Sequence, residues 1–235
     1  MPTRLYLPII ALTALLAAGS YGAAEAADTS PPVTPPAWHD SFTTRLEALA
    51  LLQSLNADLL SHDSATLTLE RWCAAHHLAD PATVTAERVH DIDKAPTAAQ
   101  RELLHVSAIE PVGYRRVRLH CGLHVLSEAD NWYVPGRLTA GMNQNLDHSD
   151  VPFGRAVQAL KFQRHTLAAG LLWMPLPADW ETKAAAVAVS PGTLEVPHYV
   201  LQHTAVLSLP DGTPISTLTE TYTAEVLAFP QPGPF

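Results

Sequence analysis

The stretch that most constrains the fold of this chain is Tyr114–Pro135, YRRVRLHCGLHVLSEADNWYVP. Its first part alternates polar and apolar residues with the period of two that is typical of a β-strand. Gly122 supplies a turn signal, and a second run follows it and ends at a proline. We therefore expect a β-hairpin that carries arginines on one arm and Glu128 on the other.

The first arm of this hairpin contains Arg115, Arg116 and Arg118. The planar fork of an arginine holds a carboxylate by two hydrogen bonds, so the hairpin is suited to form the floor of a site for an anionic ligand. The alternative is an ordinary hairpin with a solvated arginine face. Strand alternation puts Arg115 on the face of Val117 and Arg116 on the face of Arg118. The sequence does not decide which arginine points into a cavity.

Length and composition indicate one sizeable domain with a real core, or at most two small ones. The chain has 235 residues, of which 47% are hydrophobic and 16% are charged. Its formal net charge of -9 argues against sequence-independent binding of nucleic acid through a basic surface.

The first 26 residues have the features of a secretory signal peptide. Arg4 gives a positive start, residues 5–18 are apolar, and Ala24-Glu25-Ala26 fits a cleavage site. We expect cleavage after Ala26, a proline-rich linker over residues 27–40, one domain over residues 41–235, and a periplasmic or secreted protein without a stable membrane span. The alternative is an uncleaved N-terminal anchor. In an oxidising compartment Cys73 and Cys121 either form a disulfide or remain as two buried thiols.

The order of the expected elements indicates an α+β fold. Leucines at three- and four-residue spacing predict an amphipathic helix over residues 41–61, and Ser64 is a candidate N-cap for a second helix to about His77. Strands are expected at residues 83–89, 162–173, 199–209 and 215–229, with a short helical run over 97–104 and an excursion over 175–197. Asp211-Gly212 predicts a hairpin turn between the last two strands.

The last expected strand contains the most informative residue. Counting by twos places Glu220 with Leu218 and Tyr222, whereas Glu225 falls with the threonines of the opposite face. A carboxylate on the apolar face of a strand is costly unless it is paired or performs a task. Glu220 is therefore a candidate acid/base or a ligand for a substrate hydroxyl. The alternative is a buried Glu–Arg pair that only joins two strands.

Other chemical motifs are not evident in the sequence. The twelve histidines have no properly spaced partners for a metal ion, so we expect no metal site. The common hydrolase and nucleotide-binding patterns, such as G-x-S-x-G and the P-loop, do not occur. These observations favour neither metal nor nucleotide chemistry.

The order of these motifs resembles chorismate lyase and the related UTRA ligand-binding domain of bacterial transcription regulators. The matching pieces are YRRVRLHC, SEADNWYVP, PFGR at 152–155 and DGTPISTLTETY at 211–222. The resemblance implies a single α+β domain in which helices cover an antiparallel sheet of about six strands and enclose a small ligand cavity. It also implies a cofactor-independent reaction, the elimination of pyruvate from chorismate to give 4-hydroxybenzoate.

The resemblance also suggests which residues form the site. Aligned from Cys121 backwards, the arginine that holds the ring carboxylate falls on Arg116, and the catalytic glutamate falls on Glu220. The backbone of Phe153 and Gly154 would close on the ligand, and the UTRA relatives add Arg118 and Glu128. The spacing from Pro214 to Glu220 is one residue longer than in the enzyme, so a bulge is needed if the match is to hold.

Three functions compete. The first is a lyase acting on chorismate or a similar cyclic carboxylate. The second is an exported, non-catalytic protein that binds an aromatic carboxylate in a UTRA-like pocket, and the third is an accessory envelope protein with a vestigial pocket. The carboxylate on the apolar face of the last strand favours the lyase, whereas the export signal favours the binding protein, because chorismate is made and consumed in the cytoplasm.

Overall fold

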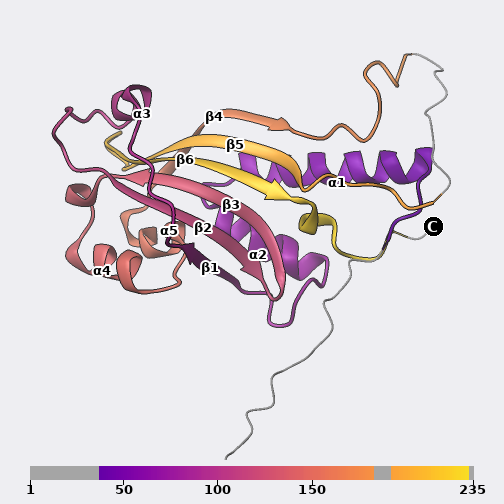
Figure 1. Cartoon of the computed structure of the whole chain (residues 1–235), viewed down its shortest axis with the longest axis horizontal. Coiled ribbons are helices and arrows are strands. Elements are labelled where there is room, and N and C mark those ends of the chain that lie inside the picture. Colours follow the sequence, from indigo (N-terminus) through magenta and orange to yellow (C-terminus); the bar gives the residue numbers. More distant parts are fainter. Residues whose placement is uncertain (1–36, 183–191, 233–235) are drawn as a thin grey trace, which may run out of the picture. The chain divides into compact units, whose positions relative to one another are not determined.

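A computed structural model describes residues 37–182 and 192–232. The expected signal peptide and most of the linker lie outside the described residues, as does part of the excursion over 175–197. The described part is built around a six-stranded antiparallel sheet with the strand order β1-β2-β3-β6-β5-β4 (Figure 1). The strands are β1 (Val84–Val89), β2 (Gly113–Cys121), β3 (His124–Tyr133), β4 (Gln163–Leu171), β5 (Tyr199–Ser208) and β6 (Pro214–Thr223). The predicted α+β class, with about six antiparallel strands covered by helices, is confirmed.

Two helices cover one face of this sheet, which we call the inner face (Figure 1). They are α1 (Phe42–Leu60) and α2 (Ala65–Ala75), with Ser41 and Ser64 as their N-caps. Helix α1 buries a stripe of leucines, α2 buries Leu69 and Trp72, and strand residues such as Val117 complete the same cluster. Burying each such side chain is worth about 1.5–3 kcal/mol, so the two helices and the sheet stabilise each other. The buried face of α1 fixes which side chains of the sheet are enclosed.

A disulfide joins the second helix to the arginine-bearing strand. Cys73 of α2 bonds Cys121 of β2, with 6.5 Å between their Cα atoms. Both cysteines are buried. The bond fixes α2 over β2, and the N-terminus of α2 is thereby placed above the inner face.

The remaining helices lie towards one end of the sheet (Figure 1). Helix α3 (Ala98–Leu103) begins at Thr97 with a capping box, and Leu104 just beyond it packs with Trp132 and Val134. Helices α4 (Ala140–His148) and α5 (Phe153–Ala156) follow the hairpin, together with the 3-10 turns η1 (Pro135–Arg137) and η2 (Gln158–Leu160).

The last strand ends earlier than the sequence predicted. β6 stops at Thr223 and the chain turns into the 3-10 helix η3 (Ala224–Leu227), so the strand expected to reach residue 229 is six residues too long. Thr223 causes the turn, because its side chain accepts a hydrogen bond from the Glu225 backbone and caps η3. Glu225 therefore does not lie on a strand face, and it pairs with His124 at 2.6 Å.

The bulge that the resemblance required is present at the start of the last strand. Leu207 pairs with Ser216, whereas the next residue, Ser208, pairs with Pro214. Ile215 is therefore an extra residue on β6, which shifts the side-chain alternation between Pro214 and Glu220.

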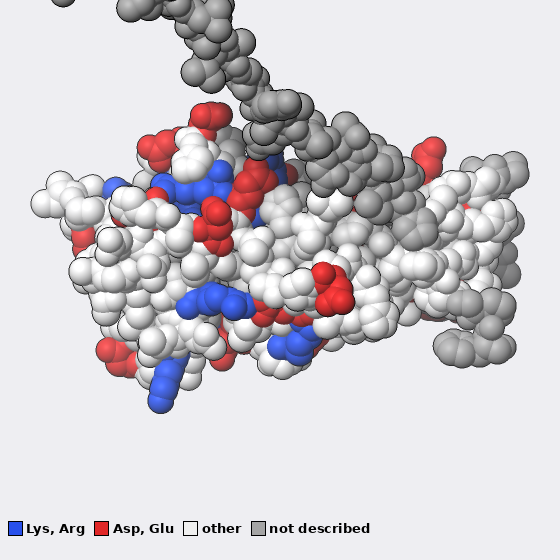
Figure 2. All heavy atoms as spheres, turned by 90° about the horizontal axis from the view of Figure 1, so that it is seen from below, with Lys and Arg blue, Asp and Glu red and all other residues white. Residues whose placement is uncertain are grey.

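The surface of the described part carries charges of both signs. On the face shown in Figure 2, acidic and basic side chains lie interspersed and do not gather by sign. Within residues 37–182 and 192–232, no helix combines the length and the apolar character that a membrane span requires.

Candidate ligand-binding site

A cavity lies on the inner face of the sheet, beneath the N-terminus of α2 and the α5 turn. Its volume is about 50 Å³, counted as the space that the centre of a water-sized sphere can occupy. One water needs only about 10–15 Å³ on this measure, so the cavity has room for a small organic molecule or for several waters. The walls are largely apolar, with several polar and charged side chains among them. The apolar side chains are Val117, Leu119, Ala129, Phe153, Phe162, Leu207 and Leu218, and the charged ones are Asp63, Arg115, Arg164 and Glu220.

Arg115 is the most unusual member of this wall. It is 2% exposed, and its guanidinium donates to the backbone carbonyls of Val151 at 2.9 Å and Ser149 at 3.1 Å. Among the described residues, no carboxylate forms an ion pair with it, and its Nε has no hydrogen-bond partner. Burial and then the nearby Arg88 lower the pKa of Arg115. Asp150 and Asp147 offset this lowering only in part. A buried cation that forms no ion pair is costly, which favours an anion beside it.

Arg164 and Glu220 form a second, charge-balanced part of the wall. Arg164 Nη2 donates to Glu220 Oε2 at 2.6 Å, and both side chains are at least nine-tenths buried. The same carboxylate oxygen accepts from the Tyr222 hydroxyl at 3.0 Å. Burial opposes the charge on Arg164, but Glu220 and Tyr222 outweigh it and raise the pKa of Arg164. The pair holds Glu220 in one orientation at the cavity wall.

Three buried N–H groups on the lining residues have no partner in the described part of the chain. They belong to Arg115 Nε, Arg164 Nε and the side-chain amide of Asn131. Asn131 lies directly across from Arg115 in the hairpin register, and its oxygen accepts from the Ser216 hydroxyl. Unpaired buried donors are rare because each costs about 1–3 kcal/mol. Three residues with such donors line one cavity, which favours a ligand that brings acceptor oxygens.

The N-terminus of α2 contributes further donors. Ser64, Ala65 and Thr66 line the cavity, and Ser64 caps the helix by accepting from the backbone of Leu67. The first backbone N–H groups of an 11-residue helix have no partner within the helix, and the helix dipole favours negative charge there. Together with Arg115, this end of α2 makes the cavity favourable for an anion.

A neutral histidine, His203, lies on the strand next to Glu220. His203 is fully buried and lies across from Glu220 in the pairing of β5 with β6. Its Nε2 lies 2.8 Å from Asn56 Oδ1, which is an acceptor, so the neutral ring carries its proton on Nε2. Burial lowers the pKa of His203 to about 4. The imidazole therefore adds no charge to the site at neutral pH.

The structure brings three of the predicted site residues together. Glu220, Phe153 and Gly154 all line the cavity. Counting by twos along the strand therefore placed Glu220 correctly on the buried face. Glu220 also forms the buried Glu–Arg pair that the sequence left open as the alternative, with Arg164 as its partner.

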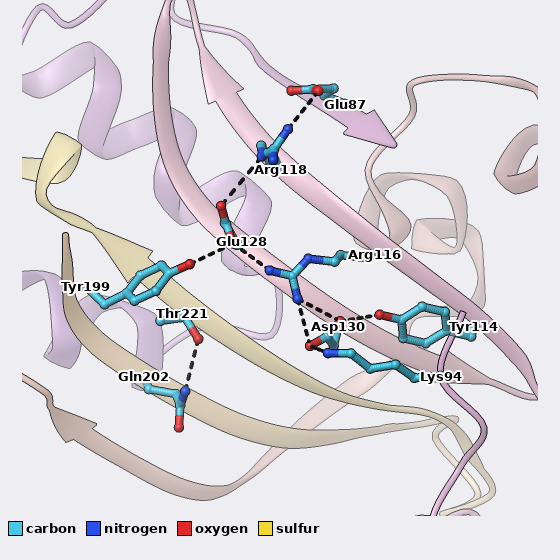
Figure 3. Close-up of polar contacts among 10 residues, drawn as sticks. All are labelled: Glu87, Lys94, Tyr114, Arg116, Arg118, Glu128, Asp130, Tyr199, Gln202 and Thr221. Atoms are coloured by element: carbon cyan, nitrogen blue, oxygen red, sulfur yellow. Dashed lines mark hydrogen bonds and ion pairs between the residues drawn. The ribbon is translucent and has the colours of Figure 1, made fainter. Parts of the chain in front are cut away.

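The other predicted site residues lie on the opposite face of the sheet, which we call the outer face. Figure 3 shows Arg116 reaching from β2 to Glu128 and Asp130 of β3. Arg118 pairs with Glu87 and Glu128 on the same face. None of Arg116, Arg118 and Glu128 lines the cavity. The reason is strand alternation: Arg115 shares the inner face with Val117, so its neighbour must point outwards.

The outer-face residues satisfy one another. Arg116 Nη2 lies 2.7 Å from Glu128 Oε2, which also accepts from Tyr199 at 2.9 Å, and Tyr114 donates to Asp130 (Figure 3). Burial and then the bond to Asp130 raise the pKa of Tyr114. Arg116, the arginine assigned from the resemblance, is thus paired with two carboxylates, whereas Arg115 is paired with none among the described residues.

Sequence reasoning missed two residues of the cavity. Arg164 lies near the start of β4 and Asn131 near the end of β3. Asn131 could have been found, because alternation along β3 places it on the face of Ala129 and Tyr133. Nothing in the sequence around Arg164 points to a buried partner on β6.

Comparison with solved structures gives only distant similarity. The chain is similar to a possible transcriptional regulator, YydK of Bacillus subtilis, at 18% identity and a TM-score of 0.38, over 64% of this chain and 62% of that one. It is also similar to PhnF of Mycobacterium smegmatis, at 14% identity and a TM-score of 0.46, over 72% of this chain and 67% of that one.

Comparison with curated proteins gives a close relative. No known family model matches the chain. A protein of Sinorhizobium fredii, uncharacterized protein y4mC, is 54% identical to this chain over 196 residues, which is 83% of each protein. The chain belongs to the same family as the uncharacterized protein y4mC.

Proposed function

We propose that this protein binds a small cyclic or aromatic carboxylate in the inner-face cavity. The observation that carries the proposal is the set of three unpartnered N–H donors on Arg115, Asn131 and Arg164, all of which line a cavity with largely apolar walls. A carboxylate supplies two acceptor oxygens and the negative charge that Arg115 lacks, whereas a neutral ligand supplies only the acceptors.

The walls favour a flat, apolar body behind the carboxylate. Phe153 and Phe162 line the cavity together with leucines of the strands. Side chains of this kind gain free energy by covering an apolar ring, and the few polar groups fix its orientation. A sugar or a peptide would leave its hydroxyl or amide groups without partners against these walls.

Calorimetry with a matched pair of probes tests this proposal without altering the protein. 4-Hydroxybenzoate and 4-hydroxybenzamide have nearly the same shape and differ in charge. A hydrogen bond to a charged group is worth about 1.5–3 kcal/mol, so we expect the carboxylate to bind about 10- to 100-fold more tightly than the amide. Equal affinities would show that no cation in the site recognises the carboxylate.

A lyase is the second candidate, because Glu220 lines the same cavity as the two arginines. In this reading Arg115 holds the ring carboxylate of chorismate, and Glu220 acts at the ring hydroxyl or as a general acid while pyruvate leaves and the ring becomes aromatic. Arg164 keeps the carboxylate of Glu220 in position at 2.6 Å. No cofactor is needed for this elimination.

Incubation with chorismate, with 4-hydroxybenzoate and pyruvate measured together, tests the lyase. Glu220→Gln is the informative variant, because it removes the ionisable group and keeps the size of the side chain. We expect product from the wild-type protein and none from the variant, with both shown to be folded by circular dichroism. Tight binding of 4-hydroxybenzoate without turnover would leave the binding function and exclude the lyase.

We further propose that the protein is exported, with cleavage after Ala26. The disulfide between Cys73 and Cys121 supports this, because disulfides persist mainly in oxidising compartments. Mass spectrometry of the protein from the periplasm and the cytoplasm of the producing cells checks the proposal. We expect a mature chain that begins at Ala27 in the periplasmic fraction, and a full-length cytoplasmic chain would contradict it.

A further inference from the structure

A second hollow adjoins the cavity at the end of α2. It has a volume of about 240 Å³, measured in the same way as the cavity, and it is more open to solvent. Four residues line both spaces: Asp63, Ser64, Gly154 and Phe162. The cavity and the hollow are therefore neighbours that share one wall, formed by the N-terminus of α2, the α5 turn and Phe162. We call this shared wall the passage.

Gly154 has no side chain that would fill space at this shared wall. A Cβ at this position would lie 3.3 Å from Ser64 Oγ and 3.8 Å from Phe162 Cζ, so it would stand between the two. The backbone of Gly154 does not require glycine, because its φ is not in the left-handed region. Glycine within a helix costs about 1 kcal/mol relative to alanine, so its presence in α5 needs another reason.

Arg115, which forms no ion pair among the described residues, lies away from the passage. Arg115 lines the cavity and also a polar hollow on its other side, together with Arg88 and Tyr133. None of the four passage residues lines that polar hollow. A carboxylate bound at Arg115 therefore directs the opposite end of the ligand towards the passage.

Charges around the outer hollow do not favour a second anion. Asp63 stands at the passage itself, and its carboxylate accepts from the backbone of Arg164 at 2.8 Å. The hollow also contains Lys161 and Arg71, of which Arg71 is paired with Asp58. The charged side chains around the hollow therefore have both signs, and Leu67 and Phe162 add apolar surface. An uncharged extension fits this surface best.

We propose that the ligand is a carboxylate with an uncharged tail, that the tail passes between Ser64 and Phe162 into the outer hollow, and that Gly154 sets the width of the passage. This inference rests on the proposed binding function and specifies the class of ligand. The ring and carboxylate occupy the cavity, and the tail lies between α2 and α5. A bulkier residue at position 154 excludes the tail without touching the groups that hold the carboxylate.

Calorimetry with benzoate and 4-butoxybenzoate tests the inference in the wild-type protein, in Gly154→Val and in Gly141→Val. Gly141 is the matched control, because it is an exposed helical glycine whose Cβ would meet nothing within 4 Å. The measured quantity is the ratio of the two affinities. We expect wild-type protein and Gly141→Val to bind 4-butoxybenzoate at least as tightly as benzoate, and Gly154→Val to lower that ratio at least tenfold. Gly154→Ala should lower it by a smaller factor.

The outcomes separate this inference from the function on which it rests. Binding of benzoate together with rejection of 4-butoxybenzoate by the wild-type protein would show a closed cavity and overturn the passage. An unchanged ratio in a folded Gly154→Val protein would overturn the role of Gly154. Failure of both probes to bind would instead contradict the proposed binding function and the passage with it.

Discussion

Acidification should destabilise this protein through one buried histidine. His203 is fully buried, and its Nδ1 has no partner among the described residues. Burial opposes a positive charge on the ring most strongly; Glu220 favours that charge, Arg164 opposes it, and the net effect is a lowered pKa. Protonation would place a charged N–H group in this space without an acceptor. The folded protein therefore binds a proton at His203 less readily than the unfolded chain does.

The size of the effect follows from the two pKa values. The pKa of His203 falls from 6.5 in its ordinary environment to about 4 in the folded protein. At about 1.4 kcal/mol for each pH unit, the total effect is about 3 kcal/mol. Because the unfolded chain binds the proton first, this stability is fully present above pH 6.5 and is lost as the pH falls towards 4. Between pH 7 and pH 4.5 the loss is about 2 kcal/mol.

Urea unfolding at pH 7 and at pH 4.5 measures this loss in the wild-type protein, in His203→Gln and in His165→Gln. The glutamine amide at position 203 can still donate to Asn56, but it does not titrate. We expect the free energy of unfolding of His203→Gln to fall by about 2 kcal/mol less than that of the wild type between these pH values. His165 is exposed, so its variant should behave as the wild type does. Equal losses in all three proteins would refute the reasoning.

Three further predictions concern the enclosure of the site. Reduction of the Cys73–Cys121 bond, which closes a loop of 48 residues, should lower the free energy of unfolding by about 4 kcal/mol, as measured by urea unfolding with and without reductant. An unchanged midpoint would show that the bond does not constrain the chain. Gly113→Ala should cost about 1–3 kcal/mol, because its Cβ would lie 2.6 Å from the Tyr133 ring; a variant as stable as the wild type would contradict this packing. Glu220→Gln should lower the free energy of unfolding by about 3 kcal/mol, because it leaves a buried guanidinium without its counter-charge, and thermal unfolding with a loss below 1 kcal/mol would argue against the pair.

Local patterns in the sequence predicted most of the fold. The helix expected over residues 41–61 is α1, and Ser64 caps α2 as predicted. The hairpin around Gly122 and the turn at Asp211-Gly212 also form. These features depend on caps, turns and side-chain periods that act over a few residues, which is why the sequence reveals them. The end of β6 was missed, because Thr223 can continue a strand or cap a 3-10 turn equally well.

The candidate site was only partly predictable. Face counting located Glu220 because the apolar period of β6 is regular around it. The alignment that chose Arg116 was one residue away from Arg115, and in a strand one residue exchanges the two faces of the sheet. Arg164 escaped notice because its partner is 56 residues away on another strand. Such pairings depend on strand order, which the sequence does not show.

The most direct measurement of the central claim compares two neighbouring arginines. Arg115→Lys and Arg116→Lys keep the same charge on the same strand, but the first changes the cavity wall and the second changes only the outer face. Both proteins are titrated with 4-hydroxybenzoate by calorimetry, after unfolding curves show that they are folded. We predict that Arg115→Lys weakens binding at least tenfold and that Arg116→Lys binds as the wild type does. Loss of affinity in Arg116→Lys alone would contradict the inner-face site and return the binding role to the outer face.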